Sequence, residues 1–399
     1  MPLFDAKKLI LLRGVMKDEA VSHFARAVAE DDIDHYAQAY ALLLRENMQN
    51  NFADYLAHVL VRDDNLFARR AFAGTADAAA EAAFVHDLRL FIELAEKADD
   101  LPERLEKEVA AGFPKIKKGK AGILHAGRIK QTVRTLAEYY RKNGYGIFIG
   151  NKAFTYENGA LLPVRNTSNI TLADLKDYED EKRAVGGNIV SFIGGLPYSN
   201  MLLYGDKGTG KSSTIHAMLN EYAEQGLRAV ELPKERVTEI NEVKDLLCTL
   251  PFHFLIFIDD LSLEENDGKV TALKAGLEGS MNEKSSNVMI VATSNRRHIL
   301  KENFSDRDNS VHARDTMEEQ LSLSDRFGLT VCFSSTGKKE YLSIVRQLAD
   351  DAGISLPEEE LFALAERWAI AKGGRSPRRA KQFVDYASAC TAKNIEIEI

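Results

Sequence analysis

The chain has 399 residues, of which 45% are apolar, and a net charge of −8. Such a chain is typical of an ordinary globular protein with two or three domains, and its acidic balance argues against wholesale coating of nucleic acid, although a local basic face is compatible with it. The three cysteines match no metal-ligand spacing, the N-terminus has too short an apolar run for a signal peptide, and no stretch is long enough to span a bilayer. We therefore expect a cytoplasmic protein with no membrane contact of its own.

Residues 1–145 are predicted to be a helical N-terminal region. Segments such as HYAQAYALLLREN (35–47) carry apolar residues at steps of three and four without strand alternation. The sequence does not identify the task of this region.

The segment 114–142 is strongly basic and contains a single acid, Glu138. Such a bias suits phosphates or an acidic partner, so nucleic acid is a candidate partner here. A solvated helix face and loop would have the same composition, and no nucleic-acid motif surrounds the segment. Its basic residues are Lys115, Lys117, Lys118, Lys120, Arg128, Lys130, Arg134, Arg141 and Lys142.

Residues 146–169 are expected to form a β-hairpin linker. In AFTYENGALLPV (153–164), Asn158-Gly159 separates two short β-prone runs, which predicts a hairpin with a type I′ turn. Pro163 restricts the second run to an edge strand.

Residues 170–336 alternate apolar β-runs with amphipathic helices, which predicts an α/β core with a parallel five-stranded sheet covered on both faces. The predicted strands lie in NMLLYG, RAVELP, FHFLIFIDD, NVMIVATSN and LTVCFSS. Residues 337–399 contain three helical segments and are expected to form a C-terminal helical lid.

A phosphate-binding loop is predicted at 205–212, GDKGTGKS, which satisfies the pattern G-x-x-x-x-G-K-S/T after a strand and before a helix. The glycines let successive amides point inward at an anion, and the helix N-terminus adds partial positive charge. We expect Lys211 to bridge the β- and γ-phosphates and the Ser212 hydroxyl to bind Mg²⁺.

Two carboxylates follow the predicted buried strand FLIFIDD (254–260). The carboxyl end of a parallel strand is where ligands bind, so we expect Asp259 to hold Mg²⁺ through water and Asp260 to orient or deprotonate the attacking water.

With these motifs the chain resembles the AAA+ branch of P-loop ATPases, and more closely a bacterial family of predicted AAA+-type ATPases without an assigned function. The resemblance covers residues 170–392. It implies that Tyr178, in DLKDYEDEK, contacts adenine and that Asn295, in IVATSN, is the sensor 1 residue that helps hold the lytic water. It further implies an arginine finger at Arg326, in LSLSDRFG, and a sensor 2 arginine at Arg378, in GGRSPRRA.

Each of these assignments has an alternative. Tyr178 also suits ordinary core packing, and Arg375 is an alternate for sensor 2. Arg307 and Arg314, in the polar insert 301–320, compete with Arg326 for the finger role.

One departure from the family pattern concerns the second carboxylate. Most AAA+ ATPases carry Asp-Glu after the strand, whereas this chain has Asp259-Asp260, as some replication-initiation relatives do. Glu264 or Glu265 could substitute, so nucleotide binding is a firmer expectation than hydrolysis.

The expected function is Mg²⁺-dependent ATP hydrolysis in a homo-oligomer, with the arginine finger acting in trans and hydrolysis coupled to remodelling of a protein or nucleic-acid partner. The alternatives are an ATP-gated scaffold with little turnover, a helicase-loader-like DNA-associated ATPase and a small-molecule kinase. The residues expected to contact the nucleotide are Gly205, Asp206, Lys207, Gly208, Thr209, Gly210, Lys211, Ser212, Ser213 and Tyr178.

Overall fold

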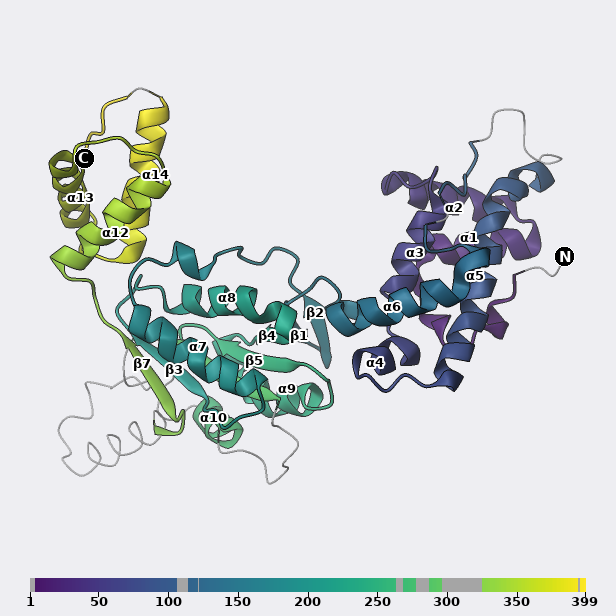
Figure 1. The fold of residues 1–399 in the computed structure, drawn as a ribbon, viewed down its shortest axis with the longest axis horizontal. Helices are drawn as coiled ribbons and strands as arrows, with labels where there is room; N and C mark the ends of the chain where they lie inside the picture. Colours follow the sequence, from purple (N-terminus) through teal and green to yellow (C-terminus); the bar gives the residue numbers. More distant parts are fainter. Residues whose placement is uncertain are drawn as a thin grey trace. The chain divides into compact units, whose positions relative to one another are not determined.

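The computed structural model describes residues 4–105, 114–120, 122–262, 268–277, 287–295, 325–393 and 395–399 (Figure 1). It forms two compact units, Met1–Asn151 and Lys152–Ile399. In the part of the chain that it describes, no helix is long and apolar enough to cross a membrane.

The first unit is helical, which confirms the prediction for the N-terminal region. Acidic N-caps start its first two long helices, since the Asp18 carboxylate accepts the Val21 N–H and the Asp32 carboxylate accepts two. Aromatic pairs fill its core, for example Phe24 and Phe52, whose ring centroids lie 4.2 Å apart. Its elements are η1 (Ala6–Lys8), η2 (Leu12–Lys17), α1 (Glu19–Glu30), α2 (Ile33–Arg45), α3 (Phe52–Val61), α4 (Leu66–Phe72), α5 (Ala78–Leu105), η3 (Ala126–Arg128), α6 (Ile129–Asn143) and η4 (Gly146–Phe148).

The second unit contains one seven-stranded sheet with the order β2-β1-β4-β5-β6-β3-β7. All neighbouring pairs are parallel except β1 and β2. The prediction of five strands was wrong in number, because the hairpin expected in the linker 146–169 pairs with β4 and extends the sheet by two strands. The strands are β1 (Ala153–Glu157), β2 (Ala160–Pro163), β3 (Met201–Gly205), β4 (Leu227–Glu231), β5 (His253–Ile258), β6 (Val288–Ser294) and β7 (Leu329–Phe333).

The hairpin has the turn that its sequence predicts. Glu157 pairs with Ala160 across a two-residue connection, and Asn158 and Gly159 have φ angles of 49° and 81°. Positive φ at both central residues is the requirement of a type I′ turn. Pro163 ends β2, the outermost strand, where a missing N–H costs no ladder hydrogen bond.

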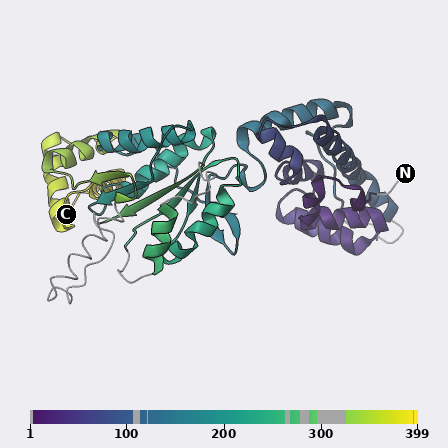
Figure 2. The same ribbon diagram turned by 90° about the horizontal axis from the view of Figure 1, so that it is seen from below.

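Helices cover both faces of this sheet, as Figure 2 shows for the teal helices on one side and the green helices on the other. On one face, α7 and α8 bury Val185, Phe192 and Met218 against strand residues such as Leu203 and Leu255. Fully parallel strands need this double cover because both of their faces are apolar. The helical elements between the strands are η5 (Leu172–Asp174), α7 (Glu179–Ile193), α8 (Lys211–Tyr222), η6 (Ala223–Gln225), η7 (Lys234–Glu239), α9 (Ile240–Leu247) and α10 (Gly268–Leu277).

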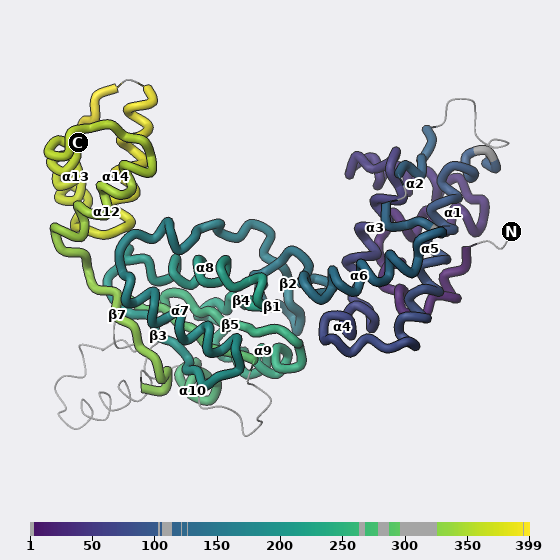
Figure 3. The backbone as a smooth tube through the Cα atoms, viewed as in Figure 1, coloured from purple at the N-terminus to yellow at the C-terminus, as the bar shows by residue number. Residues whose placement is uncertain are grey.

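Three helices after β7 form a small bundle, which confirms the predicted helical lid. They are α12 (Lys338–Asp351), α13 (Glu358–Ala371) and α14 (Pro377–Ala392), and Figure 3 traces the chain from β7 into them. The bundle has its own core, with Tyr341, Leu361 and Phe383 buried together. Ser376 caps α14 by accepting the Arg379 N–H, and Pro377 occupies the first helical turn.

Candidate nucleotide site

The loop between β3 and α8 has a backbone that requires glycine at three positions. Gly205, Gly208 and Gly210 have φ angles of 133°, 85° and 97°. A Cβ at Gly205 would lie 2.0 Å from the Phe333 carbonyl oxygen, because the ends of β3 and β7 approach closely there. The glycines therefore let the loop make a sharp turn at the carboxyl edge of the sheet, where α8 begins.

Lys211, the first residue of α8, is held on this loop with only 7% of its surface exposed. Its Nζ donates to the carbonyl oxygens of Gly205 at 2.9 Å and Asp206 at 2.8 Å. Burial lowers the pKa of Lys211, while the nearby carboxylates oppose that effect. The loop thus presents an ammonium group whose position is fixed by backbone oxygens and whose charge has no direct carboxylate partner among the described residues.

Ser212 and Asp259 lie together beside Lys211. The Ser212 hydroxyl donates to Asp259 Oδ1 at 2.5 Å, and the Thr293 hydroxyl donates to the same oxygen at 2.5 Å. A hydroxyl and a carboxylate oxygen within contact distance are hard donors of the kind that Mg²⁺ prefers. The donor set at this point fits the metal that the sequence predicts.

Asp260 adopts a left-handed conformation with φ of 49° and is held by three groups. Its N–H donates to Thr293 Oγ1 at 2.9 Å, and Asn295 Nδ2 donates to its Oδ1 at 2.6 Å. Lys234 Nζ lies 3.8 Å from its Oδ2. Because Asn295 Oδ1 is also 3.3 Å from Lys211 Nζ, this amide links the carboxylate to the phosphate loop.

Thr293 and Lys234 are site residues that the sequence analysis did not identify. Thr293 is on β6, two residues before Asn295, which directly follows the strand. The period of two therefore places both side chains on one side, and the sequence did contain that signal. Lys234 follows β4, and its proximity to Asp260 depends on the pairing of β4 with β5.

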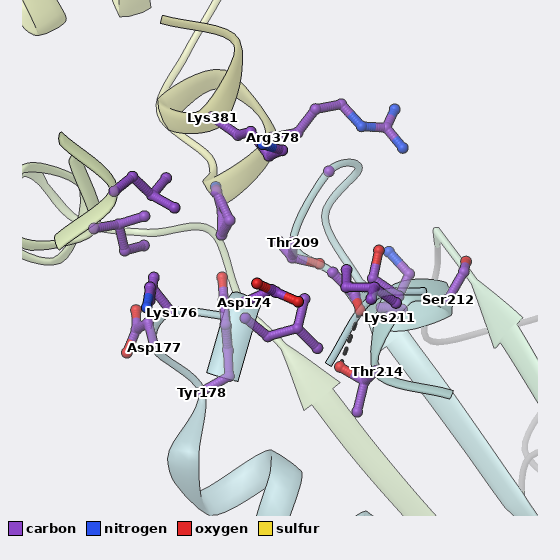
Figure 4. A pocket seen from close by; sticks show the side chains of 18 of the residues that line it. Asp174, Lys176, Asp177, Tyr178, Thr209, Lys211, Ser212, Thr214, Arg378 and Lys381 are labelled. Carbon is purple, nitrogen blue, oxygen red and sulfur yellow. Dashed lines mark hydrogen bonds between the residues drawn. The ribbon is translucent and has the colours of Figure 1, made fainter. Parts of the chain in front are cut away.

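A cavity of about 1030 Å³ joins the loop to the lid. Figure 4 shows the lid helix with Arg378 and Lys381 over the loop of Thr209 and Lys211, with Asp174, Lys176 and Tyr178 beside it. The Arg378 N–H donates to the Gly208 carbonyl at 3.2 Å. Lys207, Ser213, Asp259, Asp260 and Asn295 also line this cavity, so most of the predicted site residues meet in one place.

Tyr178 has a position that agrees with both interpretations of the sequence, and its contact with adenine stays a prediction. It lines the cavity, yet its hydroxyl donates to the Ser334 carbonyl at 2.6 Å and its ring packs 5.2 Å from that of Phe333. Burial raises the pKa of the hydroxyl.

The described arginine candidates have different surroundings in the structure. Arg378 lines the cavity, whereas the alternate Arg375 forms a two-bond ion pair with Glu366 at 2.9 and 2.7 Å. Arg326 precedes β7, and Leu329 of β7 pairs with Met201 at the start of β3. It therefore lies at the amino edge of the sheet, away from its own phosphate loop. The remaining candidates lie outside the described residues: Arg307, Arg314, Glu264 and Glu265.

A family model described as "Protein of unknown function (DUF815)" matches residues 150–391. The RuvB Holliday junction branch migration motor of Thermotoga maritima is a similar solved structure, with 17% identity and a TM-score of 0.41 over 56% of this chain and 66% of that chain. A point mutant of the same protein matches with 16% identity and a TM-score of 0.41 over the same shares. No curated protein matches the chain.

Proposed function

The chain belongs to the DUF815 family, and from its own phosphate loop we propose that it binds Mg·ATP and hydrolyses it to ADP and phosphate. The observation that carries this proposal is the position of Lys211, whose buried ammonium stands at the N-terminus of α8 and faces both the glycine loop and the Asp260–Asn295 pair. A buried cation at a helix N-terminus favours the binding of a multiply charged anion.

In the proposed complex the amides around Gly208 and Gly210 and the Lys211 ammonium hold the phosphates. Ser212 and Asp259 hold the Mg²⁺, which supplies charge neutralisation at the phosphates. The adenine would lie toward Tyr178, where the cavity extends between the segment before α7 and the lid.

Asp260 and Asn295 are the groups that would act on the attacking water. Asn295 donates to Asp260 Oδ1, and Lys234 Nζ is 3.8 Å from Oδ2, beyond hydrogen-bond distance, so Oδ2 would accept a hydrogen bond from the water. Asp260 has a left-handed backbone with φ of 49°, and the hydrogen bond from Asn295 restrains its carboxylate. Positioned proton acceptors of this kind contribute about 10²- to 10⁴-fold to rate.

We further propose that the enzyme acts as a homo-oligomer in which Arg326 serves the site of a neighbouring copy. Arg326 does not line the cavity of its own chain, which supports a role in trans. A cationic group delivered to the γ-phosphate stabilises charge that develops in the transition state.

The lid would couple the nucleotide to remodelling of a protein or nucleic-acid partner in the cytoplasm. Its contacts with the core include the Arg378–Gly208 hydrogen bond and the Lys176–Asp351 ion pair at 2.8 Å, and both border the cavity. A change in the bound phosphates can therefore alter the contacts between the lid and the core.

A second candidate is an ATP-gated scaffold with little turnover, and Lys234 favours it. The Lys234 ammonium lies 3.8 Å from Asp260 Oδ2, the oxygen that an attacking water would have to reach, so it competes with water for that position.

Asp260→Asn tests the proposal, with the exposed Asp245→Asn on α9 as the matched control. We expect Asp260→Asn to keep Mg·ATP binding in calorimetry and to lose about 10²-fold or more of ATPase turnover. The control Asp245→Asn should keep both Mg·ATP binding and ATPase turnover. Equal turnover in Asp260→Asn and the wild type would contradict the catalytic role, and tight binding without wild-type turnover would favour the scaffold. Specific activity that stays flat as the protein concentration rises through assembly would contradict the trans finger.

A further inference from the structure

Helix α6 belongs to the first unit (Figure 1), and its sequence places basic residues on one side of the helix. At 100° per residue, Lys130, Arg134 and Arg141 lie within about 40° of one another around the helix. All three are exposed, as are Arg128 just before the helix and Lys142 near its end. Among the described residues, none of these five cations has a carboxylate within ion-pair distance.

The orientation of this face is fixed by the opposite side of the helix. Val133, Leu136 and Tyr140 are buried where α6 packs on α4 and α5. Turning the helix would expose these three apolar side chains to water, so the helix cannot rotate its cations inward. The basic face is therefore a permanent surface of the unit.

The structure divides the basic segment 114–142 into two parts that differ in charge balance. In 114–120, Lys118 Nζ lies 3.8 Å from Glu96 Oε1, and the Lys118 N–H donates to Asp99 Oδ1 at 3.0 Å. This part is docked along α3 by backbone hydrogen bonds to Phe52 and Ala53. The three cations of the α6 face have no such acid beside them among the described residues, and they lie on one regular helix.

The side chains between the cations favour a polyphosphate over a protein. Gln131, Thr135 and the single acid Glu138 are exposed on the neighbouring arc of the helix, and exposed Tyr139 lies about 180° around the helix from Lys130. Protein interfaces depend on buried apolar anchors and have few charges at their centre. Lysine, arginine and small hydroxyl or amide side chains are the usual contacts of a phosphate backbone.

We propose that the α6 face binds the phosphate backbone of nucleic acid without reading its sequence. The rest of the chain carries the excess of acid that gives the net charge of −8, so nucleic acid is attracted locally at this face and not by the charge of the chain as a whole. The binding is independent of ATP hydrolysis.

Salt dependence gives the expected size of the effect. Three cations that each neutralise one phosphate of a duplex give a slope of about −2.7 for log K against log salt, and a variant that lacks them should have a slope near zero. Between 50 and 200 mM salt, the association constant of the wild type should fall about 40-fold, and that of the variant should change little.

The test uses the full chain and a fluorescein-labelled duplex, with a single strand of the same sequence as a second probe. The variant is Lys130→Gln/Arg134→Gln/Arg141→Gln. The matched control, Arg26→Gln/Arg45→Gln/Arg89→Gln, removes three exposed cations from α1, α2 and α5 and so changes the net charge equally. Mg·ATP affinity and thermal unfolding are measured on the same samples.

We expect both probes to bind, the α6 variant to lose affinity with the reduced slope, and the control to bind like the wild type. Mg·ATP affinity should be the same in all three proteins; its absence in all three would contradict the proposed ATPase and leave the nucleic-acid result intact. Arg134→Gln alone should reduce the slope by about 0.9, which gives a result even where the triple variant is unstable. No binding at 50 mM salt, equal losses in variant and control, or equally tight binding of polyglutamate would overturn the proposal.

Discussion

Replacing Lys211 by methionine isolates the charge at the centre of the candidate site. Methionine keeps the length and the buried apolar stem, so the main loss is the ammonium group that donates to Gly205 and Asp206 and faces the cavity. Gly205 is half-buried and Asp206 is exposed, so solvent can hydrate the two carbonyl oxygens and we expect little change in stability.

The expected loss of nucleotide affinity follows from the burial of this ammonium. A hydrogen bond to a charged group contributes about 1.5–3 kcal/mol, and the 7% exposure of Lys211 places it in the upper part of that range. The dissociation constant of Mg·ATP should rise about 50- to 150-fold.

Lys207→Met is the matched control, because Lys207 is in the same loop but exposed. Calorimetry with Mg·ATP should show a change of less than about 5-fold for this variant, since exposed charges contribute about 1 kcal/mol or less. Equal dissociation constants for Lys211→Met and Lys207→Met, in proteins with the same unfolding temperature, would refute the role of the buried ammonium.

The remaining predictions concern the loop and the lid. Gly205→Ala should unfold several degrees lower than Gly210→Ala in thermal melts, because its Cβ meets a backbone oxygen at 2.0 Å whereas that of Gly210 has nothing within 4 Å; equal melting temperatures would contradict the close approach of β3 and β7. Burial lowers the pKa of Lys211, so Mg·ATP affinity should fall with rising pH from below 10.5, the ordinary lysine value, and Lys211→Met should lack this fall. Because the pKa of Lys211 is lower in the folded state than in the unfolded state, the unfolded state binds the proton more tightly. The contribution of Lys211 to the free energy of unfolding should therefore increase as pH rises through the same window. Arg378→Ala should lower ATPase turnover about 10-fold, and Arg375→Ala, which breaks only the Glu366 pair, should leave it within about 2-fold.

The loop and the acids after β5 could be predicted from the sequence because both are local. Gly208, Gly210 and Lys211 are specified by the conformations and charge that one short loop needs, and the strand before them is a continuous apolar run. The five parallel strands of the core and the lid helices follow from the same local patterns, since each element carries its own periodicity.

The features that were missed depend on pairing between distant segments. The hairpin was predicted correctly as a local structure, but its addition to the edge of β4 depends on contacts between residues about 75 positions apart, such as Ala153 and Ala229. The closeness of Lys234 and Asp260 depends likewise on the register of β4 and β5. A single sequence shows local propensity and does not show which edges meet.

The hairpin and the candidate catalytic acid belong to one rigid part of the second unit. β1 pairs with β4, Arg236 donates to the Tyr156 carbonyl of β1 at 2.5 Å, and β4 continues into Lys234, which lies 3.8 Å from Asp260. Shifting the hairpin would break a strand ladder and a charge-assisted hydrogen bond, which costs several kcal/mol at about 1.5–3 kcal/mol for the latter alone. The lid, by comparison, contacts the cavity wall through polar groups at its rim, including the Arg378–Gly208 bond. We therefore expect nucleotide-driven motion to occur between the lid and the sheet, with the hairpin moving as part of the sheet.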